Sequence, residues 1–239
     1  VMQGYFNPNR SGHGMFLSQA DSAWALVWYT YLEDGSPTWY LAANSAPTGN
    51  DGVWRAPLYR LTWNGSVSYA DVVGEVLLTF ESASRFTFSW LLDGQYGSEP
   101  FQMAASPSCP SVGGAPVSYS GAWANPAESG WGFSVTAVSV AEADAAYVFD
   151  SAGVARWLLG VTTTPGAAVT IPLLQHRGFC PTCAFSGVTT SQAGTLTRNY
   201  ANKAGGTATI NIGWLQGVPG TWARSNATQQ KITVDMPCQ

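Results

Sequence analysis

The residues best placed to do chemistry lie in a short motif that occurs twice. The first copy covers residues 7–14 (NPNRSGHG) and the second covers residues 125–132 (NPAESGWG). Glycines beside a turn let backbone N–H groups approach a ligand closely, because glycine has no side chain in the way. The shared frame therefore predicts one scaffold with a candidate ligand site at each copy.

The polar and aromatic side chains of the motif differ between its copies. An Arg and a His in the first copy are replaced by a Glu and a Trp in the second. This difference predicts a cationic polar site in one copy and an aromatic platform in the other. A structural role is the favoured alternative, because a bend or bulge between two strands needs glycine for geometry alone. The candidate ligand-binding residues of the motif are Asn7, Arg10, His13, Asn125, Glu128 and Trp131.

Tryptophan supplies the second set of candidates, since the chain contains 11 Trp and aromatic residues make up 13% of it. Large rings in a small barrel mostly fill the core, so burial is the favoured role for any single Trp. Two cores of this size need fewer rings, and the surplus is expected to be exposed for stacking or to lie between the repeats. Besides Trp131, the candidates for ligand binding are Trp28, Trp39 and Trp157.

The four cysteines form an even set and allow three pairings. We favour Cys180–Cys183 as a local clip and Cys109–Cys238 as a long bond, because Cys109 and Cys238 close their respective repeats in similar Pro-containing contexts. The Cys-x-x-Cys spacing also occurs in redox and zinc sites, to which His176 and the other two cysteines could contribute. A structural disulfide is the favoured interpretation.

Catalysis finds little support in the sequence. The chain has 2 His and no Gly-x-Ser-x-Gly elbow. Its carboxylates offer no preferred pair, and no loop with alternating Asp or Asn ligands predicts a calcium site. We therefore expect a protein that is not an enzyme, with no catalytic residue, metal or cofactor. A secreted hydrolase with two catalytic carboxylates is the least favoured hypothesis.

Composition and charge exclude several classes of partner. Only 10% of the residues are charged and 46% are hydrophobic, which excludes a disordered chain. The net charge is −4 and lysine occurs only at Lys203 and Lys231, so no basic surface for a nucleic acid is expected. No apolar stretch reaches the roughly 18 residues of a membrane-spanning helix.

The same features predict a location outside the cytoplasm. An even set of cysteines, few lysines and abundant Thr, Ser, Gly and Trp favour a secreted, periplasmic or cell-surface protein. The first residues lack the pattern of a signal peptide, so the chain is expected to be a mature or trimmed product.

The repeat extends well beyond the motif. Tyr29 and Trp39 recur, at the same spacing from the motif, as Tyr147 and Trp157. This predicts two related units of about 110 to 120 residues each. The units cover residues 1–105 and 118–239, and a linker rich in Pro, Gly and Ser covers residues 106–117. Residues 177–186, with the Cys-x-x-Cys, are an insertion in the second unit, and such insertions are natural places for function.

Each unit is expected to contain about eight short strands separated by Gly, Pro, Asn and Asp turns. The stretch from Trp24 to Tyr31 is apolar on both faces, so it should be covered on both sides, and the last strand is expected near Lys231–Val234. Sequential antiparallel strands can close into a barrel that removes exposed edges. The predicted fold is all-β, with two tandem antiparallel meander units that form small barrels or curled sandwiches.

Two resemblances support this interpretation. An aromatic strand, an Asn-containing turn and a Gly-flanked second strand open each repeat, and this pattern resembles the avidin-like barrels. Residues 11–14 (SGHG), 28–31 (WYTY) and 34–40 (DGSPTWY) together resemble a sequence type of uncharacterised secreted bacterial tandem-repeat proteins. The second resemblance implies export.

Three functional hypotheses follow. The first is a recognition module that binds carbohydrate or another cell-surface ligand through exposed aromatic rings. The alternative is a structural or accessory subunit of an extracellular assembly, with self-association or protein contacts through the surplus aromatics. The third is the secreted hydrolase. An aromatic cleft with a few polar groups would favour the first hypothesis, and flat apolar patches would favour the second.

Overall fold

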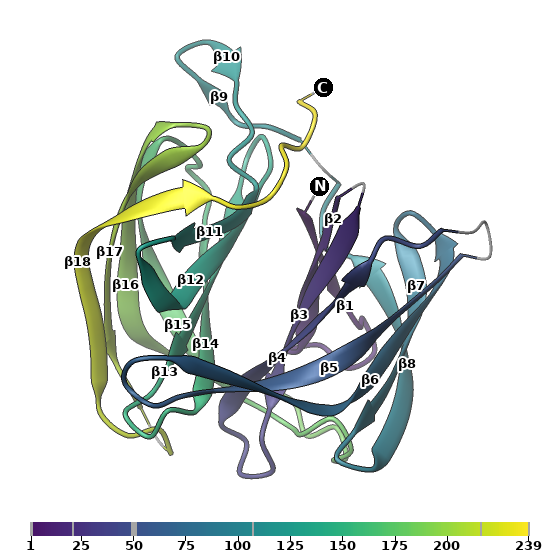
Figure 1. Cartoon of the computed structure of the whole chain (residues 1–239). Helices are drawn as coiled ribbons and strands as arrows, with labels where there is room; N and C mark the ends of the chain where they lie inside the picture. The colour runs from purple at the N-terminus through teal and green to yellow at the C-terminus, as the bar shows by residue number, and fades with distance from the viewer. Residues whose placement is uncertain (1, 21, 49–51, 107, 216, 239) are drawn as a thin grey trace.

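A computed structural model describes residues 2–20, 22–48, 52–106, 108–215 and 217–238. Every regular element in this part of the chain is a β-strand, and the strands form two closed eight-stranded antiparallel barrels in tandem. Figure 1 shows the barrels side by side, with the small β9–β10 hairpin projecting above the second barrel. No helix that could span a membrane occurs in the described ranges. The predicted fold class is confirmed.

The first barrel closes where β1 pairs with β8, with Tyr5 opposite Met103. Each strand otherwise pairs with the next one along the chain, as expected for short turns between antiparallel neighbours. Its strands are β1 (Met2–Phe6), β2 (Gly14–Gln19), β3 (Ala23–Tyr31), β4 (Pro37–Ser45), β5 (Val53–Trp63), β6 (Ser68–Ser82), β7 (Arg85–Leu92) and β8 (Gln95–Met103).

The second barrel repeats this order and closes where Trp123 of its first strand lies opposite Lys231 of its last. The linker forms the two short strands β9 (Ser111–Val112) and β10 (Ala115–Pro116). The barrel strands are β11 (Gly121–Asn125), β12 (Glu128–Ala137), β13 (Glu142–Phe149), β14 (Ala155–Thr162), β15 (Ala168–Arg177), β16 (Thr189–Asn202), β17 (Gly205–Gly213) and β18 (Thr221–Lys231).

The position of the last strand corrects the sequence-based expectation. The predicted strand at Lys231–Val234 begins where β18 ends, and β18 itself covers Thr221–Lys231. The stretch was missed because it lacks the apolar alternation that marks a strand. Its buried or half-buried side chains include Trp222, Arg224 and Gln229, and the opposite strand β17 shifts register between Ala208 and Ile210.

Strand β3 is covered on both faces, as predicted. Leu26 and Trp28 point into the first barrel and are fully buried in its core. The alternate residues Val27, Tyr29 and Tyr31 lie in a separate apolar cluster with residues of β13 and β14. Because side chains alternate along a strand, one run of apolar residues serves both the core and the contact between the barrels.

The contact between the barrels is reciprocal. Tyr29 packs on Trp157 with ring centroids 5.1 Å apart, and the equivalent pair of Tyr147 and Trp39 has centroids 5.6 Å apart. Each barrel thus contributes the same Tyr and the same Trp position to the contact, and such reciprocal pairs are expected when two units are related by a twofold axis. The repeated residues therefore mark an interface in which the two barrels face each other symmetrically.

Backbone hydrogen bonds across the interface follow the same symmetry. The N–H of Trp63, at the end of β5, donates to the carbonyl of Gly153 (3.0 Å), and the N–H of Gly178, just after β15, donates to that of Gly35 (3.1 Å). Gly35 and Gly153 occupy corresponding hairpin turns and have positive φ angles of 79° and 77°. Glycine adopts this conformation without strain, which explains why both repeats have it there.

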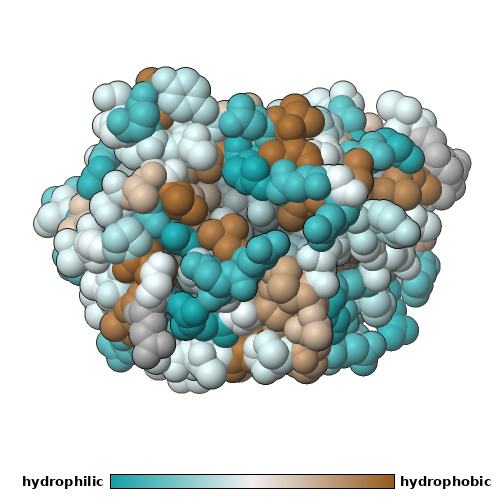
Figure 2. Space-filling view, turned by 90° about the horizontal axis from the view of Figure 1, so that it is seen from below, coloured by the Kyte–Doolittle hydropathy of each residue, from teal (hydrophilic) through white to brown (hydrophobic). Residues whose placement is uncertain are grey.

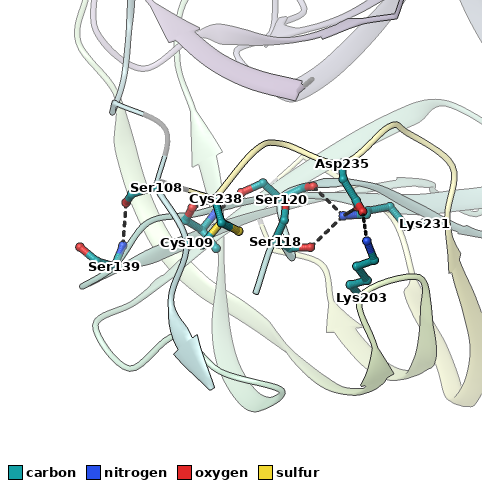
Figure 3. Close-up of a disulfide and its surroundings, with 10 residues drawn as sticks. Ser108, Cys109, Ser118, Ser120, Ser139, Lys203, Lys231, Asp235 and Cys238 are labelled. Atoms are coloured by element: carbon teal, nitrogen blue, oxygen red, sulfur yellow. Dashed lines mark hydrogen bonds and ion pairs between the residues drawn. A yellow bond between two sulfur atoms is a disulfide. The ribbon is translucent and has the colours of Figure 1, made fainter. Parts of the chain in front are cut away.

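The linker and the chain end close the upper end of the second barrel (Figure 3). Cys109 and Cys238 form a disulfide there, so both favoured disulfides are present. The ammonium group of Lys231 donates to the carbonyl of Ser118 (2.8 Å) and forms an ion pair with Asp235 (2.6 Å). These contacts join the linker and the chain end to the second barrel.

Candidate functional site

The three motif residues of the first copy gather around a carboxylate that the sequence did not single out. Asn7 donates to Glu99 (2.8 Å), Nε2 of His13 lies 2.9 Å from Oε2 of Glu99, and Arg10 forms an ion pair with the same group. Asn7, His13 and Glu99 are buried. Glu99 and Phe101 both point to the inner face of β8, because they are two residues apart on one strand. An acidic residue at such an inward position is the sequence signal that could have identified Glu99.

The insertion of the second repeat covers this cluster. Arg10 donates to the carbonyl of Cys183 (2.9 Å), and its guanidinium lies 4.8 Å from the ring centroid of Phe179. The edge of Phe179 also packs against His13, with centroids 5.5 Å apart. The lower end of the first barrel is therefore capped by a loop of the second, held by the Cys180–Cys183 disulfide.

The charge of Glu99 is stabilised in this cap. Burial alone would raise the pKa of its carboxyl group, but the contacts from His13 and Asn7 and the nearby charge of Arg10 hold that pKa below its ordinary value. Asn7, Arg10 and His13 thus surround a single buried carboxylate at this end of the first barrel.

The corresponding end of the second barrel has a different character. Glu128 forms an ion pair with Arg224, whose guanidinium lies 4.8 Å from the ring centroid of Trp222. Trp222 in turn packs edge-on against Trp131, with centroids 5.4 Å apart. Asn125 accepts a hydrogen bond from the N–H of Ala127 (3.0 Å) and so shapes the turn. Trp222 and Arg224 escaped the sequence analysis because β18 was placed too late in the chain.

Trp222 also lines an open depression of about 600 Å³ at this end. The depression is formed where β16, β17 and β18 begin or end, and its other polar lining residues are Gln192, Thr195, Asn211 and Thr221. Figure 2 looks onto this end of the molecule, where apolar patches are interspersed among hydrophilic residues. The depression thus combines an aromatic ring with uncharged amide and hydroxyl groups.

The remaining candidate tryptophans lie inside the molecule. Trp28 is fully buried in the core of the first barrel, and Trp39 and Trp157 lie in the interface between the barrels. The indole N–H of Trp157 donates to the carbonyl of Thr30 (2.9 Å). The surplus of Trp is largely taken up by this interface, which is one of the two roles expected for it. None of these three rings offers its face to solvent.

The second barrel contains charges where the first is apolar. Arg198 forms ion pairs with Glu142 and Asp144, and all three side chains are fully buried. The equivalent residues of the first barrel are Leu78, Trp24 and Leu26 by the repeat alignment. Burial raises the pKa of Asp144 well above its ordinary value. Arg198 thus contacts both carboxylates inside the second barrel.

The Cys-x-x-Cys insertion is a disulfide loop in this structure. Cys180 and Cys183 are bonded to each other, and Cys109 is bonded to Cys238. His176 stacks on Trp157 with centroids 4.9 Å apart. Within the described residues, no group of three or more His, Cys, Asp or Glu side chains is arranged to hold a metal ion.

Comparison of the chain with protein-family models, with curated proteins and with solved structures returned no significant match.

Proposed function

We propose that the protein is an exported, non-catalytic recognition module that binds carbohydrate at the uncapped end of its second barrel. The observation that carries this proposal is the contrast between the two barrel ends. The insertion seals the polar cluster of the first barrel, whereas Trp222 of the second barrel lines an open depression.

The chemistry of the depression suits a sugar. The C–H face of a pyranose ring is apolar and packs on an aromatic side chain, while its hydroxyl groups need neutral hydrogen-bonding partners. Trp222 supplies the ring, and Gln192, Thr195 and Asn211 supply amide and hydroxyl groups. The Glu128–Arg224 ion pair packs against the Trp222 ring and does not line the depression.

The two disulfides are consistent with an extracellular location, where carbohydrate ligands are abundant. Disulfides persist in oxidising compartments, and the long Cys109–Cys238 bond ties the linker to the chain end. Export therefore remains part of the proposal.

The test is calorimetric titration of the full chain with a panel of soluble polysaccharides. We expect one class of glycan to bind the wild-type chain and Trp222→Ala to weaken that binding at least about tenfold, as a lost aromatic contact would. The matched control is Tyr96→Ala, because Tyr96 is 85% exposed on the first barrel. Unchanged binding by the Trp222 variant, or no glycan that binds, would exclude this site.

A specific observation favours the accessory-subunit hypothesis as a second candidate. Val72 is 64% exposed on β6, and Leu91 and Tyr96, which face each other across β7 and β8, are also exposed. Exposed apolar side chains on neighbouring strands are typical of contact surfaces. Light scattering over a range of concentrations should then show self-association that Val72→Lys abolishes, and a monomer at all concentrations would count against it.

A further inference from the structure

The reciprocal interface leaves a groove on each side of its twofold axis. The Trp39 groove has a volume of about 380 Å³, and its lining includes Ala25, Trp39, Leu41, Trp131 and Tyr147. The Trp157 groove has a volume of about 330 Å³, and its lining includes Tyr29, Ala143, Trp157 and Leu159. Ala25, Trp39 and Leu41 correspond to Ala143, Trp157 and Leu159 in the repeat, so the grooves are counterparts.

The indole N–H groups of the two grooves are not equally satisfied. The N–H of Trp157 donates to the carbonyl of Thr30 (2.9 Å). The N–H groups of Trp39 and Trp131 have no hydrogen-bond partner among the described residues, although these side chains are only 8% and 7% exposed. A buried donor without a partner destabilises the fold, and Trp39 and Trp131 are the two such indole donors that line this groove, where a bound molecule could supply the acceptor.

The two grooves also differ in charge. His13, His176 and Glu142 contribute to the lining of the Trp157 groove. Within the described part of the chain, no charged residue lines the Trp39 groove, and most of its lining is aliphatic or aromatic. A charged ligand would lose its hydration there without gaining a partner. The lining therefore selects for a neutral, largely apolar molecule.

We propose that the Trp39 groove binds an uncharged, largely apolar small molecule whose carbonyl or ether oxygen accepts hydrogen bonds from Trp39 and Trp131. The volume of the groove lies in the range of small-molecule pockets, which typically bury an apolar body and fix it with a few polar groups. This site goes beyond the carbohydrate site at the barrel end, because it lies on the seam between the barrels and takes a ligand of a different class.

The first test uses the probe Prodan, a neutral dimethylaminonaphthalene ketone whose fluorescence shifts on burial, with the full chain. We expect saturable binding at one site. Ala25→Phe should abolish the binding by filling the Trp39 groove, whereas the counterpart Ala143→Phe fills the other groove and should leave it unchanged. No binding to the wild-type chain, equal binding by the Ala25 variant, or loss in the Ala143 variant would overturn the proposal.

The second test addresses the hydrogen-bond donor. Trp39→Phe should weaken Prodan binding about three- to tenfold, the value of one hydrogen bond. The same substitution should not affect the binding of dimethylaminonaphthalene, which lacks the ketone oxygen. Trp157→Phe is the control, since the N–H of Trp157 is already bonded within the chain. Equal effects on both probes would overturn the role of the donor, and if Trp39→Phe fails to fold, Trp131→Phe gives the same test.

The two proposed sites fail independently of each other. Gln192→Ala removes an amide group of the barrel-end depression and should leave Prodan binding intact, because Gln192 does not line the Trp39 groove. Ala25→Phe should conversely leave any glycan binding intact, because Ala25 does not line that depression. Loss of Prodan binding in the Gln192 variant would contradict the separation of the two sites.

Discussion

Single residues account for the different character of the two barrels. At the motif, Arg10 and His13 stand where the second repeat has Glu128 and Trp131, and only the first pair has a carboxylate, Glu99, to bind. Inside the barrels, Leu78 of the first repeat corresponds to Arg198 of the second, and Arg198 forms ion pairs with two buried carboxylates. A few substitutions on one scaffold, together with the insertion that covers the first motif, therefore distinguish the polar cluster of the first barrel from the aromatic end and the buried ionic cluster of the second.

Glu99 should control the acid stability of the first barrel. Since the pKa of Glu99 is lowered in the folded chain, its contribution is present above its ordinary pKa and is lost as the pH falls through the folded value. Glu99→Gln should cost about 3 kcal/mol at neutral pH, as does breaking a buried charged pair. Urea unfolding at several pH values measures the free energy of unfolding of both chains. The difference between the variant and the wild type should shrink in acid. A difference that persists in acid would contradict this role.

Asp144 should have the opposite pH dependence. Because the pKa of Asp144 is raised in the folded chain, its contribution is present below its ordinary pKa and is lost as the pH rises through the folded value. Asp144→Asn keeps an acceptor for Arg198 without the charge. We expect the variant to gain stability relative to wild type as the pH rises from 4 to 7. An equal difference at both pH values would refute the assignment.

Among the secondary-structure elements, two long hairpins connect the barrels. The β5–β6 hairpin reaches the second barrel, where Trp63 stacks on Phe149 with centroids 6.0 Å apart. The β15–β16 hairpin reaches the first, where Phe179 packs against His13. Only the second hairpin has the insertion and its disulfide, so only the first barrel is capped. The presence of this loop, more than any strand, decides which end stays open.

The two disulfides should differ in their contribution to stability. Cys109–Cys238 joins residues 129 positions apart, whereas Cys180 and Cys183 are 3 apart. In the chain-entropy model the long bond stabilises the fold by about 5 kcal/mol and the short one by about 2 kcal/mol. Urea unfolding of the two paired Cys→Ser variants compares them directly. A larger loss on removing the short bond would show that the cap contributes more than its loop length implies.

The whole molecule is one body held by an apolar, symmetric interface. Tyr31, Trp39, Tyr147, Phe149 and Trp157 are all buried in it. Interfaces between domains permit relative motion unless they are large and hydrophobic, and this one is built like a core. Its symmetry also creates two counterpart grooves, which differ in volume and in the charge of their lining residues.

The two barrels should therefore unfold together. We expect a single calorimetric transition for the wild-type chain, with equal calorimetric and van't Hoff enthalpies. Trp157→Ala should cost about 3 to 5 kcal/mol and separate the barrels into two transitions, because Trp157 lies in the interface. Trp54→Ala is the matched control, since Trp54 lies in the core of the first barrel alone. Two transitions in the wild type would contradict the rigid interface.

The sequence alone determined the repeat, the class of fold and the favoured disulfides. These follow from local signals, namely recurring residues, short apolar runs between turn residues, and the contexts of Cys109 and Cys238. It also indicated that β3 would be covered on both faces, because both faces of the stretch from Trp24 to Tyr31 are largely apolar.

Only the tertiary structure decided where each chemical group ended up. Trp39 and Trp157 lie in an interface, Glu99 contacts Arg10 and His13, and the half-buried Trp222 lines an open depression. These contacts join residues far apart in the chain, such as Arg10 with the loop at Cys183. The type and spacing of residues specify which strands form, but the closure and docking of the barrels determine which side chains meet.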